Sequence, residues 1–321
     1  MKKNKQYDIT QCALYMCPTR RKLAKYLKID YHRMMRMDFN SQYHTYPRKE
    51  TKRGKTKIRM ITAPFDELKK IQSRIHILLQ PIIRPSWLMS SVKGKSYIDN
   101  GKAHVNAKYA LAMDIEKFYD RCTREYVYRF FVDKLKTAPD VAKVLTDVVT
   151  YNGIIPTGSP ASQVLAYFAY EDMFVELEQR AVALGCNFTL LVDDTTTSSV
   201  VPFNKERLIA DITRVMKKYG HNPKKEKTQY YAKDKPKPIT GTVVTTDNNL
   251  AVPKRLQSEI YTIFQKLKSI ESKMNGNVEF SSEVAVLSGK LQAAVNINPK
   301  IFPNINKVVK CWQLMLSTSK V

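Results

Sequence analysis

Apolar and polar positions follow patterns along the chain that predict a mixture of helices and strands. Residues 66–84 and 204–219 repeat apolar side chains at helical spacing, so each is predicted to be an amphipathic helix. Further helical patterns occupy residues 8–38, about 123–151, about 161–183 and most of the chain after Val252. Strand-like runs occupy 43–46, 58–62, 109–119, 188–199 and 243–244. This order of strands and helices predicts an α+β fold.

The most informative run is 188–199, where adjacent aspartates, Asp193 and Asp194, lie in a predicted turn between two short strands. Two carboxylates side by side repel each other unless cations lie between them. Asp114 ends another apolar, strand-like run. Three carboxylates at neighbouring strand ends could hold two hard cations about 4 Å apart, as in-line phosphoryl transfer requires. The pattern therefore predicts a nucleic-acid polymerase.

Charge supports a polyanionic partner. The chain has 54 Lys and Arg against 29 Asp and Glu, a net charge of +25, which attracts nucleic acid. A generic basic protein, such as a ribosomal component, is disfavoured because the chain has no low-complexity tail. The apolar runs are too short to span a membrane, and no apolar core of the kind that a secretory signal needs follows residues 1–6. The five scattered cysteines are expected to be reduced thiols, which favours a cytoplasmic location.

Further motifs occur in a fixed order. They are Lys57-Ile-Arg59 with Ile61-Thr-Ala-Pro64, Asn100-Gly-Lys-Ala-His104, Asp114-Ile-Glu-Lys-Phe-Tyr119, Pro156-Thr-Gly-Ser-Pro160, Leu191-Val-Asp-Asp194, Lys227-Thr228 and Ile239-Thr-Gly241. Together, over roughly residues 43–300, they resemble the bacterial reverse transcriptases of the retron type. The resemblance implies a right-hand polymerase: 1–42 would be an N-terminal basic helical segment, 43–105 the fingers, 106–248 the catalytic palm and 249–321 a helical thumb.

The resemblance also implies roles for single residues. The metal ligands would be Asp114, the carbonyl of Ile115, Asp193 and Asp194, and the cofactor would be two Mg²⁺ ions. Residues that contact or approach the incoming nucleotide would be Lys57, Arg59, Tyr119, Gly158 and Lys227. Among these, Tyr119 would clash with a ribose 2′-OH and so select dNTPs. The alternatives are a solvated basic strand for Lys57 and Arg59, core packing for Tyr119 and an unspecific basic surface for Lys227.

Two motifs imply contact with a cognate structured RNA. Ile239, Thr240 and Gly241 stand where retron enzymes carry Val-Thr-Gly, and a plain β-turn is the alternative. Asn100 and His104 stand where the family has Asn-Ala-x-x-His. For this pair we favour hydrogen bonding that shapes a loop, with direct RNA contact as the alternative.

The chain departs from the family pattern at several positions. Gly101 replaces Ala, Thr157 replaces a frequent Gln, and Leu190 and Leu191 replace the usual Arg-Tyr before the two aspartates. Both aspartates remain, so the departure bears on primer positioning and fidelity more than on metal binding.

The expected function is RNA-directed DNA synthesis from dNTPs by two-metal-ion nucleotidyl transfer. In the family, one noncoding RNA is the template and, through an internal 2′-OH, the primer for the product DNA. Such systems usually serve antiphage defence together with an effector protein.

Two alternatives remain open. One is a non-retron, defence-associated or abortive-infection reverse transcriptase that makes untemplated or repetitive DNA. The other is a catalytically silent RNA-binding scaffold, which retention of all three aspartates disfavours. No membrane partner is expected.

Overall fold

The computed structural model describes residues 6–52, 55–271 and 278–318, except for the side chains of residues 50–52, 55 and 57. The chain forms two compact units, neither continuous in sequence. Unit 1 comprises Met1–Lys95, Ala112–Thr197 and Asn204–Gln229, and unit 2 comprises Ser96–Leu111, Ser198–Phe203 and Tyr230–Val321. Among the described helices, none has the length and apolarity needed to cross a bilayer.

The first half of the chain is mostly helical, with one long hairpin. Its elements are η1 (Ile9–Gln11), α1 (Arg20–Leu27), α2 (Tyr31–Arg36), η2 (Asn40–Gln42), β1 (Tyr43–Lys52), β2 (Lys55–Pro64), α3 (Asp66–Leu79), α4 (Tyr97–Lys102), β3 (Tyr109–Asp114), η3 (Tyr119–Arg121), α5 (Arg124–Arg129), the π-helix η4 (Phe130–Lys134) and α6 (Pro139–Val149).

The second half alternates helices with short strands before ending in helices. Its elements are α7 (Ser162–Ala169), α8 (Glu171–Val182), β4 (Asn187–Leu191), β5 (Asp194–Ser199), α9 (Lys205–Lys218), η5 (Lys225–Lys227), β6 (Gln229–Tyr231), β7 (Lys237–Ile239), β8 (Thr242–Val244), β9 (Leu250–Ala251), α10 (Lys254–Ser269), α11 (Val278–Ile297) and α12 (Pro303–Thr318).

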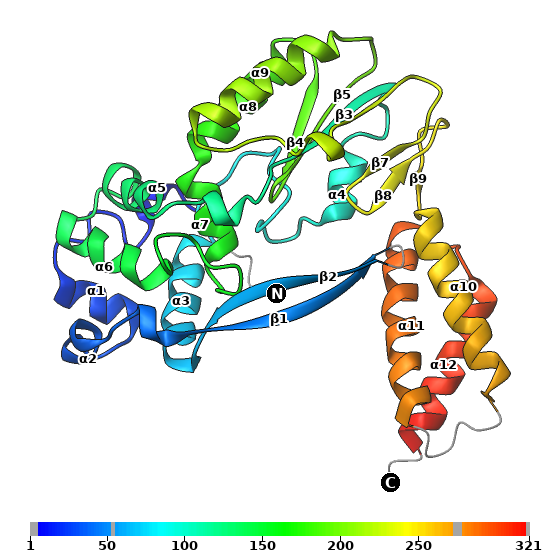
Figure 1. Cartoon of the computed structure of the whole chain (residues 1–321), viewed down its shortest axis with the longest axis horizontal. Coiled ribbons are helices and arrows are strands. Elements are labelled where there is room, and N and C mark those ends of the chain that lie inside the picture. Colours follow the sequence, from blue (N-terminus) through cyan, green and yellow to red (C-terminus); the bar gives the residue numbers. More distant parts are fainter. Residues whose placement is uncertain (1–5, 53–54, 272–277, 319–321) are drawn as a thin grey trace. The chain divides into compact units, whose positions relative to one another are not determined.

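The described strands form three small sheets, which confirms the mixed α+β class. β1 and β2 make a long antiparallel ribbon (Figure 1), in register from Tyr43↔Pro64 to Lys52↔Lys55. A second sheet has the order β4-β5-β3-β6, and a third, antiparallel sheet has the order β7-β8-β9. The short connections within each hairpin are ones that only antiparallel strands allow.

Unit 1 buries the apolar faces of its helices. The side chains of Leu68, Ile75 and Leu79 on α3 are fully buried, as the helical spacing predicts. α9 begins at an N-cap, where the Asn204 carboxamide oxygen accepts a hydrogen bond from the Arg207 N–H at 2.9 Å. Both amphipathic helices predicted from spacing are therefore confirmed, α3 being shorter because Pro81 follows its end.

Unit 2 contains a helical bundle of α10, α11 and α12, which lie side by side (Figure 1). Trp312 is fully buried in it, with its ring 5.6 Å from Phe264 and 5.5 Å from Phe280, centroid to centroid. The Trp312 indole N–H donates to Glu271 Oε1 at 2.7 Å, so its polar atom is satisfied. The helical prediction for this region is confirmed.

Two predicted helices are each broken into shorter ones. The 123–151 stretch divides into α5, η4 and α6, because Lys136 adopts a left-handed φ of 53° and Pro139 starts a new helix. The 161–183 stretch divides at Tyr170, whose hydroxyl donates to the Arg121 carbonyl at 2.9 Å and accepts from the Thr123 N–H at 3.0 Å. A third difference is that the strand predicted over 109–119 ends at Asp114, and Tyr119 begins η3.

Candidate active site

The two adjacent aspartates lie at the tight turn between β4 and β5: Asp193 is in the turn, as predicted, and Asp194 is the first residue of β5. β4 ends at Leu191 and β5 begins at Asp194, which leaves two residues for the turn. β5 is the neighbour of β3, whose last residue is Asp114. The N–H of Ile115 donates to the Asp193 carbonyl at 3.0 Å, so the two acidic segments are joined by backbone. The three aspartates of the sequence prediction therefore come together in unit 1.

The turn itself has an unusual backbone. Val192 has a φ of 62°, a left-handed conformation that a β-branched residue adopts only when its surroundings impose it. The Val192 N–H donates to Ser90 Oγ at 2.9 Å. The turn conformation is therefore held by a hydroxyl from a distant segment, which sequence reasoning missed because a lone serine gives no signal.

The carboxylates strongly influence one another. Burial raises the pKa of Asp193, and the negative charge of Asp114 raises it further. Burial also raises the pKa of Asp194, with added contributions from Asp193 and Asp114. Like charges held together away from water disfavour ionisation, so the protein alone leaves this cluster short of positive charge.

Lys227 supplies part of that charge. Its ammonium group donates a hydrogen bond to Asp114 Oδ2, and the two side chains form an ion pair. Burial lowers the pKa of Lys227, but the hydrogen bond to Asp114 and the three carboxylate charges outweigh this and raise it overall. The Lys224 N–H donates to the Asp114 carbonyl at 2.7 Å, which anchors the lysine segment to the end of β3.

The donor chemistry fits hard divalent cations, which prefer carboxylate oxygens. Three such groups gather here: the pKa values of Asp193 and Asp194 are raised, and the charge of Asp114 is offset by Lys227. Within the described ranges, however, no three His, Cys, Asp or Glu side chains are already arranged to hold a metal ion. The cluster therefore has the right donors, with Lys227 bonded to one of them.

The predicted nucleotide-contacting residues lie in the same unit. The charge of Arg59 on β2 is among those that lower the pKa of Asp193, after Lys227, so its guanidinium is close enough to act on the cluster. The β2 backbone includes Lys57, but its side chain lies outside the described part of the structure. Tyr119 is half-buried, and its pKa is raised by burial, Cys122 and then Asp193.

Gly158 packs against β2. Its N–H donates to the Thr62 carbonyl at 2.8 Å, and an added Cβ would lie 2.7 Å from that oxygen and 2.9 Å from the Ala63 Cβ. Glycine is needed here for a close backbone contact between the 156–160 loop and the ribbon. Thr157, at the position where relatives have Gln, accepts from the Thr62 N–H at 3.4 Å.

Comparison with known proteins decides the family. Residues 48–249, more than half of the chain, match the model of the family described as "Reverse transcriptase (RNA-dependent DNA polymerase)". The chain belongs to the reverse transcriptase family. The resemblance inferred from the motifs is thereby confirmed.

Curated relatives of this reverse transcriptase are retron enzymes. The chain is 29% identical over 175 residues to the Retron Se72 reverse transcriptase of Salmonella heidelberg (strain 579083-10), a match that covers 54% of the chain and 45% of that protein. It is 23% identical over 320 residues to the Retron Ec48 reverse transcriptase of Escherichia coli, covering 94% of the chain and 78% of that protein. The alignment with the Se72 enzyme thus spans less than half of that relative. The chain is a distant homologue of bacterial retron reverse transcriptases.

The two retron-type motifs of this reverse transcriptase meet in unit 2. The Asn100 side-chain N–H₂ on α4 donates to Thr240 Oγ1 at 2.6 Å, and Asn100 is fully buried. Thr240 and Gly241 have φ values of 35° and 89°, and the Tyr97 ring packs 3.3 Å from where a Gly241 Cβ would be. The sequence predicted both motifs but not that they contact each other.

His104 is also buried. Its Nδ1 forms a 2.6 Å hydrogen bond with Ser198 Oγ, and burial lowers the pKa of its imidazole to about 4. The hydrogen-bonding role that we favoured for Asn100 and His104 agrees with these contacts. Contact of these residues with RNA stays a prediction, as it does for Ile239, whose side chain is buried.

Two departures from the family pattern have local explanations in this reverse transcriptase. Leu190 is 1% exposed within β4, so an arginine there would bury its charge. Gly101, where the family has Ala, leaves no room for a methyl group: an added Cβ would overlap Thr242 Oγ1 and lie 3.1 Å from Leu250 Cδ2.

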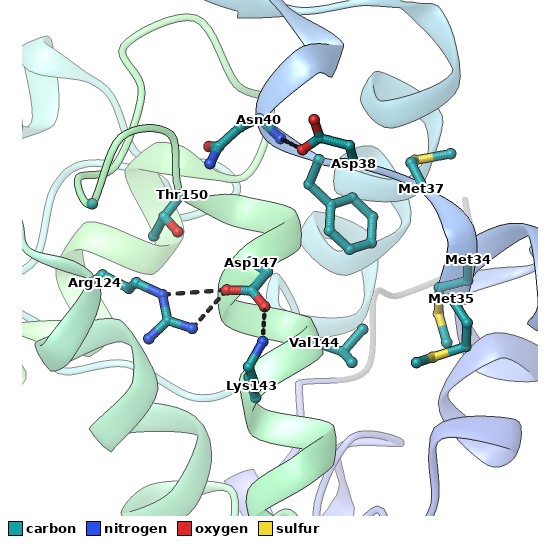
Figure 2. Close-up of a pocket in the computed structure, with 12 residues that line it drawn as sticks. Met34, Met35, Met37, Asp38, Asn40, Arg124, Lys143, Val144, Asp147 and Thr150 are labelled. Atoms are coloured by element: carbon teal, nitrogen blue, oxygen red, sulfur yellow. Dashed lines mark hydrogen bonds and ion pairs between the residues drawn. The ribbon is translucent and has the colours of Figure 1, made fainter.

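A cavity of about 410 Å³ lies elsewhere in unit 1, lined by residues of α2, α5 and α6 among others (Figure 2). Met34 and Met35 lie on one side, and the Arg124–Asp147–Lys143 ion-pair network lies on the other. Asp147 pairs with Arg124 at 2.6 Å and with Lys143 at 2.9 Å. None of the three aspartates lines this cavity, so it is separate from the catalytic candidates.

Proposed function

We propose that this reverse transcriptase copies a cognate structured noncoding RNA into DNA by nucleotidyl transfer at Asp114, Asp193 and Asp194. The observation that carries the proposal is the gathering of these three carboxylates at adjoining ends of β3 and β5, within a family match over residues 48–249. The family implies use of a divalent metal, and we assign two Mg²⁺ ions to this cluster.

The three aspartates and the Ile115 carbonyl would hold the ions. When bound, the metals would lower the pKa of the attacking hydroxyl and neutralise the triphosphate. The protein would contribute positioning and charge. Arg59 and Lys57 on the ribbon would bind the triphosphate, and Tyr119 would exclude a ribose 2′-OH. Gly158 would keep the 156–160 loop close under the nascent base pair, and Lys227 would turn from Asp114 toward the leaving phosphates.

We further assign residues 1–42 to an N-terminal basic segment, 43–105 to fingers, 106–248 to the palm and 249–321 to a thumb. Support comes from the basic ribbon, the aspartate-bearing strands and the terminal helical bundle. The Asn100–Thr240 contact supports a shared role for the two retron-type motifs, in which α4 holds the 239–241 turn in a shape that the RNA recognises.

The RNA would serve as template and as primer, with product DNA joined to it, and an effector protein would complete a defence system. The retron names of the curated relatives support these partners. Because Leu191 replaces the family tyrosine, we retain a second candidate function, that of a defence-associated enzyme that makes untemplated or repetitive DNA. The silent-scaffold alternative predicts no DNA product at all.

The first experiment purifies the chain from its native operon and sequences the nucleic acid that accompanies it. Wild type is compared with the Asp193→Asn/Asp194→Asn double variant and with Asp133→Asn, an exposed aspartate on η4 that serves as the matched control. A discrete DNA covalently joined to one structured RNA is expected from wild type and from Asp133→Asn, and none from the double variant.

Other outcomes separate the alternatives. Repetitive or random DNA without a fixed RNA would favour the second enzyme candidate. RNA bound equally by wild type and the double variant, with DNA in neither, would identify a silent scaffold. As a readout other than activity, Mg²⁺ should raise the melting temperature of wild type but not of the double variant, because a ligand that binds only the folded state stabilises it.

A further inference from the structure

The turn that carries Asp193 is held from two sides. On one side, the Ile115 N–H donates to the Asp193 carbonyl at 3.0 Å. On the other side, the Val192 N–H donates to Ser90 Oγ at 2.9 Å. The first contact joins two backbone groups, whereas the second depends on one side-chain hydroxyl. Ser90 is therefore a point at which a single substitution can release the turn.

The backbone of Val192 needs this support. Its φ of 62° lies in the left-handed region, which a β-branched residue adopts only at a steric cost. Without the Ser90 hydroxyl, Val192 is free to relax toward an extended conformation. Because Val192 directly precedes Asp193, a change in its φ or ψ turns the peptide unit that leads into the aspartate. The hydrogen bond to Ser90 thus affects where the Asp193 carboxylate points.

The segment that contains Ser90 runs along β4, the strand that leads into the turn. Leu88 forms a parallel bridge with Leu190, and the Met89 N–H donates to the Leu190 carbonyl at 2.8 Å. Both leucines are fully buried, and Ser90 is 7% exposed. The serine hydroxyl is therefore fixed relative to β4 by backbone pairing and by burial of its neighbours.

The next residue ties this segment to α3. Arg84 donates through Nη1 to the Ser91 carbonyl and through Nη2 to the Gln80 carbonyl at 2.6 Å. The Gln80 side-chain N–H₂ donates to the same Ser91 carbonyl at 3.2 Å. Gln80 is the C-cap of α3, whose apolar face is buried. Since Ser91 follows Ser90 directly, these contacts restrict the backbone on the far side of the serine as well.

We propose that Ser90 is a positioning residue, whose hydroxyl sets the place of the Asp193 carboxylate for metal binding and nucleotidyl transfer. This inference rests on the proposed function, because it concerns the same acidic cluster. Ser90 acts through the Val192 backbone. Asp194 depends on it less, because it is the first residue of β5, which lies between β4 and β3 in the sheet.

Metal binding without turnover is the first test. Mn²⁺, a paramagnetic substitute for Mg²⁺, is titrated against the full chain, free of nucleic acid and dNTPs, and the free ion is measured by electron paramagnetic resonance. Ser90→Ala should bind Mn²⁺ roughly tenfold more weakly than wild type, as expected when a group that orients a metal ligand is lost. Ser90→Thr keeps the hydroxyl and should bind as wild type does.

A matched control removes another buried hydroxyl in the same unit. Thr146 on α6 is fully buried, and its Oγ1 donates to the Ala142 carbonyl of the same helix at 2.7 Å. Thr146→Val keeps the shape of the side chain and should leave Mn²⁺ affinity unchanged. Melting temperatures of all the variants show whether any loss reflects unfolding.

Kinetics give the second readout. On a polyadenylate template with an oligodeoxythymidylate primer at saturating Mg²⁺, Ser90→Ala should lower kcat roughly tenfold and leave the KM for dTTP unchanged. This pattern is expected because a displaced carboxylate affects the reacting atoms and not the binding of the nucleotide. Ser90→Thr and Thr146→Val should keep the kcat of wild type.

Hydrogen exchange separates this inference from the proposed function. The Val192 amide should exchange faster in Ser90→Ala than in wild type, whether or not the enzyme is active. Wild type that neither binds Mn²⁺ nor extends the primer would overturn the proposed function, and the exchange rates would then decide whether Ser90 fixes the turn. The positioning role is overturned if Ser90→Ala keeps the Mn²⁺ affinity and kcat of wild type. Equal losses in Ser90→Thr or in Thr146→Val would also overturn it.

Discussion

Lys227 is bonded to Asp114 although the two residues are 113 positions apart in the chain. The ammonium group lies at a carboxylate that we assign to a metal, so it offsets negative charge in the absence of the cation. Lys227 and a divalent cation are thus two sources of positive charge for one acidic cluster.

Replacing Lys227 should therefore change how the chain responds to Mg²⁺. In Lys227→Met, loss of the half-exposed ion pair should destabilise the metal-free protein by about 1 kcal/mol. The increase in melting temperature on adding Mg²⁺ should be larger than in wild type, because the cation no longer competes with the ammonium. Differential scanning fluorimetry across a Mg²⁺ titration measures both effects. Lys225→Met, in the same η5 turn, is the control. Equal Mg²⁺ responses in all three proteins would contradict the competition.

Removing one carboxylate charge should stabilise the fold while abolishing activity. Asp194 is half-buried beside Asp193 and Asp114, which raises its pKa and makes its ionised form unfavourable. Without divalent metal at pH 7.5, Asp194→Asn should increase the free energy of unfolding by roughly 1–3 kcal/mol. Urea denaturation of wild type and variant measures the gain, and Asp133→Asn should stay within about 0.5 kcal/mol of wild type. A destabilised Asp194→Asn variant would argue against charge repulsion in the cluster.

Two buried histidines should make the fold sensitive to acid. Burial lowers the pKa of His104 to about 4, and burial together with Arg121 lowers that of His221 to about 4. Between their ordinary pKa of 6.5 and about 4, the unfolded chain binds protons that the folded chain does not, so stability falls as pH falls through this window. Each histidine can contribute up to roughly 3 kcal/mol of this loss.

Urea denaturation at several pH values between 7.5 and 4 tests this effect. His221→Phe replaces an imidazole packed between the rings of Phe118 and Tyr170 with an uncharged ring. Its stability should fall less than that of wild type as the pH drops. The exposed His32 provides the control His32→Asn, which should follow wild type. Parallel curves for wild type and His221→Phe would refute a role for this histidine.

Gly101→Ala should restore the family residue and yet destabilise this chain. The new methyl group would overlap Thr242 Oγ1, so α4 or β8 would have to shift, at a cost of about 1–3 kcal/mol. Thr242→Ala removes that oxygen and leaves the Thr242 Cβ 3.2 Å from the new methyl carbon, so the double variant should recover part of the loss. A double-mutant cycle by thermal denaturation measures the coupling. Additive effects of the two substitutions would exclude the clash.

Sequence patterns identified most elements and the acidic centre. Helical spacing located α3 and α9, and the run 188–199 located the turn that carries Asp193 and Asp194. These signals succeed because burial on one face and turn chemistry are local properties. The break at Tyr170 was not predictable, because it accompanies hydrogen bonds to Arg121 and Thr123, which are distant in the sequence.

Site geometry was harder to predict where it depends on contacts between distant segments. The motifs named Asn100 and Thr240, but nothing local indicates that their side chains meet. The same holds for Ser90 at the Val192 turn and for Ser198 beside His104.

The wide separation of the catalytic candidates also sets the order in which the centre can form during synthesis. Asp114 is translated first, and its partner Lys227 follows 113 residues later. At about 5–20 residues per second, the ribosome needs roughly 6–23 s to make the intervening chain. A nascent chain that contains Asp114 but not yet Lys227 therefore lacks the ammonium group that offsets the charge of the acidic cluster. Polymerase competence would arise only once the segment through Lys227 has emerged and folded back onto the end of β3.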